Sequence, residues 1–178
     1  MITIRQMDLS EVGRIAEIDR SEHVTTGYVY EDGKLRAEHV DWQVPRWRLE
    51  GETFSVEAHV MGIRPVLEEG GVMLGAFDRG GGLAGFAVLR YHLTENQAQL
   101  DALFVSRAYR RRGIATRLTS RVARLAKASG ADELYVSATP SESAVGFYMS
   151  QGFRLAEEGN EELYALEPED IHMIRRLA

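Results

Sequence analysis

Apolar and polar residues follow two different periods along the chain, and the pattern is clearest in the second half. Apolar positions recur every three or four residues from Ile114 to Leu125, which predicts a helix over about 112–129 that ends at Gly130. Short apolar runs at 97–106 and 133–138 flank this helix and predict strands. A strand, a helix and a strand in this order predict a right-handed parallel crossover.

The other elements follow from shorter patterns. Two apolar runs joined by a glycine-rich gap predict an antiparallel hairpin over 72–91. Asp32-Gly33 between two β-rich stretches predicts a second hairpin over about 25–42. We therefore predict an α/β (α+β) fold with a mixed, mostly antiparallel central sheet of six to seven strands and helices on both faces. The remaining expected elements are strands at 3–5, 153–156 and from Ile171, helices at about 8–19, 56–67 and 141–150, and a helical turn at 161–166.

Length and composition indicate one domain over residues 1–178, with no disulfide and no thiolate chemistry, because the 178 residues include no cysteine. No apolar run approaches 18 residues, so we expect no membrane span. The first 20 residues mix charged and apolar positions and do not resemble a secretory signal, so we expect a cytoplasmic protein. The net charge of −6 argues against a general nucleic-acid-binding protein.

Seven of the 21 basic residues nevertheless lie within 18 positions around the start of the helix at 112–129. Arg110, Arg111 and Arg112 fall in the turn before the helix, where the first backbone amides have no internal partner. Those amides and the helix dipole favour a bound anion, and phosphate is a natural choice. Arg121 and Arg124 fit a solvated helix face equally well.

Two common phosphate-binding motifs are absent. The chain has no G-x-x-x-x-G-K-[ST] motif and no G-x-G-x-x-G motif after its first strand. It has R-x-x-G-x-A at 110–115, and the segment 141–153 reads S-E-S-A-V-G-F-Y-M-S-Q-G-F. These two segments resemble [QR]-x-x-G-x-[GA] and N-x-x-A-x-x-F-Y-x-x-x-G-F of the GCN5-related N-acetyltransferase (GNAT) superfamily. The resemblance covers about 72–177 well and 1–70 only in outline.

The resemblance implies that acetyl-CoA is the cosubstrate, that no metal is needed, and that the fourth and fifth strands of the fold splay apart. Residues 72–177 would form the acetyl-CoA-binding core and residues 1–70 the acceptor side. Backbone amides of the 110–116 turn would hold the pyrophosphate, and the strand edge at 103–105 would pair with pantetheine. Ser141 replaces the usual asparagine, so its contact passes through water or is lost. The cofactor-binding residues implied are Leu103, Phe104, Val105, Arg110, Arg111, Arg112, Gly113, Ile114, Ala115, Thr116, Ser141, Ala144, Phe147 and Tyr148.

Two residues are candidates for the chemistry. By resemblance, Tyr148 is the general acid that protonates the CoA thiolate; the alternative is an aromatic that only packs with its neighbours. Asp101 is the candidate base, acting through water, and strand alternation would place it on one face with Leu103 and Val105. The alternative for Asp101 is a structural pair with an arginine. His92 and Glu95 are weaker candidates for the base.

The resemblance implies an N-acetyltransferase in which an amine attacks acetyl-CoA directly in a ternary complex, because no cysteine can carry the acetyl group. A small-molecule amine is the expected acceptor, and a protein amine is the alternative. A non-catalytic acyl-CoA-binding regulator is a further alternative, whereas a nucleic-acid or membrane partner is not expected. The family also makes a homodimer possible.

The acceptor site is expected within about 18–54, where the resemblance is weakest. Trp42, Trp47 and Phe54 would pack as core or as a lid, or would line a substrate pocket. The acidic residues of this region would suit a cationic amine, or would form an ordinary solvated surface. These residues are Glu17, Asp19, Glu22, Glu31, Asp32, Glu38 and Asp41.

Overall fold

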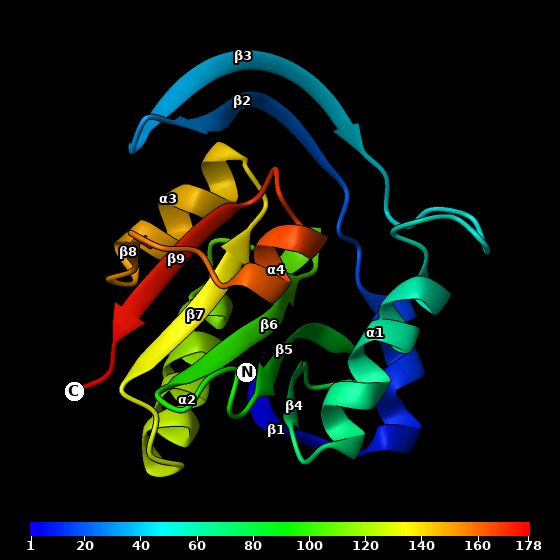
Figure 1. Cartoon of the computed structure of the whole chain (residues 1–178). Helices are drawn as coiled ribbons and strands as arrows, with labels where there is room; N and C mark the ends of the chain where they lie inside the picture. The colour runs from blue at the N-terminus through cyan, green and yellow to red at the C-terminus, as the bar shows by residue number, and fades with distance from the viewer.

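A seven-stranded sheet forms the centre of the computed structural model, which describes all residues 1–178 (Figure 1). The strands lie in the order β1-β4-β5-β6-β7-β9-β8. Every neighbouring pair is antiparallel except β6 and β7, which are parallel. This confirms the predicted sheet and its parallel crossover. The strands are β1 (Thr3–Met7), β4 (Val72–Phe77), β5 (Leu83–Arg90), β6 (Gln97–Val105), β7 (Glu133–Ala138), β8 (Arg154–Leu155) and β9 (Ile171–Arg176).

Helices cover both faces of this sheet, as the sequence predicts. On one face, apolar side chains of α2 (Ile114–Ala128) and α3 (Glu142–Ser150) share a cluster with β7. On the other face, η1 (Leu9–Glu17) and α1 (Val56–Glu68) pack on β4 and β5, and Leu163 of α4 (Glu161–Leu166) packs near Tyr135 of β7. The first helix is a 3₁₀ helix that begins after Asp8, and a single 3₁₀ turn, η2 (Arg107–Tyr109), follows β6.

The predicted hairpin at 25–42 forms, but it stays outside the main sheet. Strands β2 (Glu22–Glu31) and β3 (Lys34–Val44) make a separate two-stranded sheet that arches past α3 (Figure 1). Asp32 and Gly33 both have positive φ, 51° and 76°, as a tight hairpin turn requires. A hydrogen bond of 2.9 Å from the Tyr28 N–H to the Pro140 carbonyl joins the hairpin to the start of α3.

Strands β6 and β7 separate soon after they pair. Their parallel ladder covers only 97–99 on β6 and 133–135 on β7. Beyond that point β6 pairs only with β5, and β7 only with β9. The expected splay between these two strands is therefore confirmed, and it leaves one edge of β6 open over residues 100–105.

A β-bulge interrupts β6 where the splay begins. Leu89 pairs with Leu100 and Val88 pairs with Ala102, so Asp101 is an extra residue. This bulge interrupts the strict alternation from which Asp101 was predicted to share a face with Leu103 and Val105. Leu100 and Leu103, three positions apart, pack against the same apolar cluster, whereas Ala102 packs on the opposite one.

Candidate active site

The turn between β6 and α2 presents a row of free backbone amides. The N–H groups of residues 111–116 donate no hydrogen bond within the protein. Arg111 and Gly113 have positive φ, 63° and 74°, so the backbone curls into a concave nest that ends at the positive pole of α2. A Cβ added at Gly113 would have no heavy atom within 4 Å, so the space beside these amides is open. The turn can therefore hold a phosphate or diphosphate group.

Side chains of the same turn hold it in place. Arg110 donates from Nε to the Val105 carbonyl at 3.2 Å, and Arg112 lies 5.6 Å from the Tyr109 ring centroid. The Tyr109 hydroxyl in turn donates to Asp78 at 2.6 Å, which ties η2 to the loop between β4 and β5. Arg110 and Arg112 therefore stabilise the turn, while its backbone amides are left free.

The open edge of β6 continues from this turn. The Ser106 N–H donates to the Ala84 carbonyl of β5 at 2.9 Å. Because antiparallel hydrogen bonds alternate, the amides of Phe104 and Ala102 also point toward β5, whereas those of Leu103 and Val105 point into the splay. The Arg110 bond to the Val105 carbonyl agrees with this orientation. The turn with free amides and a strand edge with free backbone groups are thus contiguous.

The second motif forms the first turns of α3. Ser141 is the N-cap of α3: its hydroxyl accepts from the Ala144 N–H at 3.2 Å, and the residue is 2% exposed. Tyr148 packs edge-to-face between Phe147 and Phe153, with ring centroids 5.4 and 5.3 Å away. Its hydroxyl has no hydrogen-bond partner in the protein and is not fully enclosed. Burial raises the pKa of Tyr148, and Asp170 raises it further, so the phenol keeps its proton at neutral pH.

The charge of Glu167 affects two other carboxyl groups near the start of the splay. Desolvation and then Glu167 raise the pKa of Asp101 against the opposing effect of Arg90, and the result is a pKa of about 6. Burial, followed by Glu167, raises the pKa of Asp170 to about 7. Arg90 itself pairs with Glu162 at 2.8 Å. Sequence reasoning missed Glu167 and Asp170, because nothing in the acidic stretch 157–170 indicates that its end folds back toward β6 and Tyr148.

The weaker candidates for the base lie elsewhere. His92 and Glu95 belong to the connection that leads into β6, next to the end at which β6 and β7 are still paired. The distal arginines of the cluster lie along α2, beyond the turn. Arg121 and Arg124 line an open groove of about 780 Å³ along α2, together with Lys127 and Arg175.

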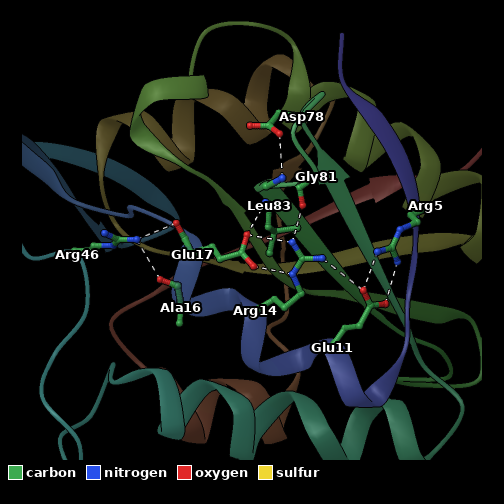
Figure 2. A network of polar contacts seen from close by, with 10 residues as sticks. Arg5, Glu11, Arg14, Ala16, Glu17, Arg46, Asp78, Gly81 and Leu83 are labelled. Carbon is green, nitrogen blue, oxygen red and sulfur yellow. Dashed lines mark hydrogen bonds and ion pairs between the residues drawn. The ribbon is translucent and has the colours of Figure 1, made fainter.

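Ion pairs fix η1, and they use part of the acidic set expected at the acceptor site (Figure 2). Arg14 bonds to Glu17 at 2.7 Å and to the Gly81 carbonyl at 2.7 Å, and Glu17 also accepts from the Leu83 N–H. Arg5 pairs with Glu11 at 2.7 Å. Arg46 donates to the carbonyls of Ala16 and Glu17, so the segment after β3 is tied to the end of η1. Glu17 is therefore a structural residue and not part of a free acidic rim.

The aromatic residues of 42–54 divide between packing and cavity lining. Trp47 is half-buried; its Nε1 donates to the Ile18 carbonyl at 2.9 Å, and its ring lies 6.1 Å from that of Phe104. Trp42 and Phe54 are 37% and 53% exposed and line a cavity of about 390 Å³. The packing interpretation therefore holds for Trp47, whereas Trp42 and Phe54 line a cavity, and its use as a substrate pocket stays a prediction.

Residues 19–153 match the model of the acetyltransferase (GNAT) family. The chain belongs to this family. The acetyltransferase is therefore an acyltransferase enzyme, and the alternative of a non-catalytic regulator is set aside. A search of curated proteins finds no match.

Solved structures share the fold of the acetyltransferase over its whole length. A nourseothricin acetyltransferase superposes with a TM-score of 0.74 at 20% identity, covering 99% of both chains. A protein from Bacillus anthracis str. Ames described as a streptothricin acetyltransferase, solved with acetyl coenzyme A, gives 0.73 at 18% identity and covers 100% of this chain and 99% of its own. The PaiA N-acetyltransferase of Thermoplasma acidophilum, solved with coenzyme A, gives 0.64 at 18% identity, with 99% of both chains covered.

The structure lacks two further features. None of its helices combines the length and hydrophobicity needed to cross a membrane. No cluster of three or more histidine, aspartate and glutamate side chains is placed to bind a metal ion.

Proposed function

We propose that this acetyltransferase moves the acetyl group of acetyl-CoA to a primary amine of a small molecule, by direct attack in a ternary complex. The observation that carries the proposal is the continuity of two binding features. The turn at 110–116 has six free amides, and the splayed edge of β6 begins immediately before it. A diphosphate joined to an extended, amide-containing arm is the ligand that such a pair of features fits.

The residues present fit acetyl-CoA at this place. The amides of Arg111 to Thr116 would bind the pyrophosphate, and Gly113 leaves the space that it needs. The backbones of Leu103 and Val105 would pair with pantetheine, while Arg110 and the ring of Phe147 would support the site from behind. Ser141 and Ala144 would act by fixing the start of α3, because the Ser141 hydroxyl is already used as a cap. Bound there, acetyl-CoA supplies an activated thioester.

Two side chains would move the protons. An amine attacks only in its neutral form, and Asp101 can accept its proton through water, because a carboxyl with a pKa of about 6 is mostly ionised at neutral pH. The C–N bond forms as the C–S bond breaks, and the leaving thiolate takes a proton from Tyr148. Burial keeps that phenol protonated until it is needed. With no cysteine in the chain, no acyl-cysteine intermediate can precede this step.

A small molecule is the proposed acceptor. Two of the structures with the same fold carry the names of acetyltransferases for nourseothricin and streptothricin, although at 20% and 18% identity they support only the fold directly. The cavity of about 390 Å³ beside Trp42 and Phe54 has the size of a small-molecule pocket.

The release of free thiol from acetyl-CoA tests this function. The assay would compare the rate with no amine, with a panel of small primary amines, and with a lysine-containing peptide. We expect release that depends on a small amine and a product that carries one more acetyl group. Turnover of the peptide alone would refute the small-molecule assignment, and no release with any amine would refute the reaction.

A further inference from the structure

Arg20 is a charged side chain that the folded chain leaves without a partner. It follows η1 and β2 begins two residues later; the residue is partly buried. Its Nη1 is fully enclosed and makes no hydrogen bond, and no ion pair or hydrogen bond in the protein uses any other nitrogen of this guanidinium. Burying a cation without a counter-charge costs free energy, so contacts within the folded chain do not explain why Arg20 is placed here.

Aromatic rings surround this guanidinium. Its central carbon lies 5.4 Å from the ring of Trp47, 5.5 Å from that of Phe54 and 5.7 Å from that of Phe104. Such rings attract a cation but give it no hydrogen-bond acceptor. They therefore hold the guanidinium in place while its Nε and Nη2, which are not fully enclosed, keep their hydrogens free.

The cavity that Arg20 lines is positive. Arg48 also lines it; burial lowers the pKa of Arg20, and the positive charge of Arg48 lowers it further. Arg48 forms no ion pair either. The one carboxylate in the lining, Asp41, is bound by His23 at 2.7 Å and Gln43 at 3.4 Å. His59, which packs on Trp47, has a pKa lowered by burial and is neutral at pH 7.

This positive cavity lies near the proposed reaction centre. The ring of Phe104 lies 5.7 Å from the guanidinium carbon of Arg20. Phe104 is three residues along β6 from Asp101, and three residues of extended chain span about 10 Å. The ring of Phe104 packs on the same face of the sheet as η1 and α1. An acceptor molecule with its amine at Asp101 and its other end at Arg20 would therefore be several bonds long.

We propose that Arg20, with Arg48 beside it, is a carboxylate subsite, and that the acceptor is an amino acid-like molecule with its carboxylate several bonds from the attacking amine. This inference rests on the proposed function, which it deepens. A planar guanidinium with a free edge binds a carboxylate through two parallel hydrogen bonds. The proposed acceptor, which carries a carboxylate, takes the place of the cationic acceptor that an acidic rim would favour.

The two tryptophans of the chain allow binding to be measured without any reaction, because Trp42 lines the cavity and Trp47 lies beside Arg20. The ligand would be 6-acetamidohexanoate, whose parent amine spans about 7–8 Å through six bonds of about 1.5 Å. N-acetylhexylamine is the neutral match. We expect a saturable change in fluorescence with the carboxylate only. Arg20→Gln should weaken this binding about 10- to 100-fold, whereas Arg36→Gln, on the exposed hairpin, should not change it.

Steady-state kinetics give the second readout. We expect kcat/KM for 6-aminohexanoate to exceed that for hexylamine and 1,6-diaminohexane at least tenfold, and Arg20→Gln to remove this preference without slowing hexylamine. Preference for 6-aminohexyl phosphate would overturn the choice of a carboxylate. If Arg20→Gln does not fold, Arg48→Gln, at an exposed position, takes its place. A fluorescence change on binding of the carboxylate, with no turnover of any amine, would refute the proposed function alone. Turnover without preference and without a fluorescence change would refute the carboxylate subsite alone.

Discussion

The Gly113→Ala variant tests separately the backbone strain of the turn at 110–116 and the proposed role of this turn in binding phosphate. Gly113 has a φ of 74°, a conformation that costs a residue with a Cβ about 1–2 kcal/mol. Gly130, which follows the other end of α2, has a φ of 97°, and like Gly113 it has no atom within 4 Å of a built Cβ. Gly113→Ala and Gly130→Ala should therefore lose a similar free energy of unfolding, with the melting temperature lowered by about 2–8 °C in each.

Their affinities for CoA should differ. At Gly113 the added carbon enters the open space beside the amides of residues 111–116 and would keep a phosphate from two or more of them. Each such charge-assisted hydrogen bond contributes about 1.5–3 kcal/mol, so we expect the loss of two to make Gly113→Ala bind CoA more weakly by a factor of about 100 or more. Gly130→Ala should bind it as the unmodified protein does.

Calorimetric unfolding with and without CoA measures both effects in one experiment. At 100 times the dissociation constant of the unmodified protein, CoA should stabilise that protein and Gly130→Ala by about 2.7 kcal/mol. Gly113→Ala should gain no more than about 0.4 kcal/mol at the same concentration. Equal stabilisation of the two glycine variants would refute the assignment of the turn as the pyrophosphate site.

Three further substitutions test the side chains. Tyr148→Phe should lower kcat for thiol release about 100-fold, with little change in CoA binding. Tyr30→Phe, at an exposed position of the hairpin, should leave kcat unchanged. An unchanged kcat in Tyr148→Phe would mean that Tyr148 only packs against its neighbours. Asp101→Asn should remove a rise in kcat/KM centred near pH 6, and a rise that persists would exclude Asp101 as the base. Because the raised pKa means that the folded state disfavours the ionised carboxylate, the same variant should be more stable than the unmodified protein above pH 6, with the difference shrinking toward pH 3.8. Arg20→Met should raise the melting temperature while removing carboxylate binding; a clear loss of stability would indicate that Arg20 is structural.

Local patterns predicted most of the elements correctly. The strand at 133–138, the helical turn at 161–166 and the hairpin turn at Asp32-Gly33 agree with the structure, because each depends on neighbouring residues in the chain. The free amides of the turn at 110–116 were also predictable, since the first amides of a helix have no internal partner; phosphate binding there stays a prediction. The first helix was expected at the right place, but its 3₁₀ geometry has no signature in the periodicity.

The features that sequence reasoning missed depend on contacts between distant segments. The bulge at Asp101 arises from the register between β5 and β6, which alternation along β6 alone does not reveal. Arg20 gains its aromatic surroundings from 47–54 and from β6, and its lack of a partner appears only when these segments are assembled. Asp170 affects Tyr148 because β9 begins beside the end of β7, where Ala138 pairs with Ile171.

The most direct test of the central claim is the mass of the amine product after incubation with acetyl-CoA. The reaction would contain 6-aminohexanoate and either the unmodified protein or Gly113→Ala, at an acetyl-CoA concentration that saturates only the former. We predict a product with one added acetyl group and an equal amount of free CoA thiol with the unmodified protein, and far less of both with the variant. Thiol release without an acetylated amine, or equal product from the two proteins, would contradict acetyl transfer at this site.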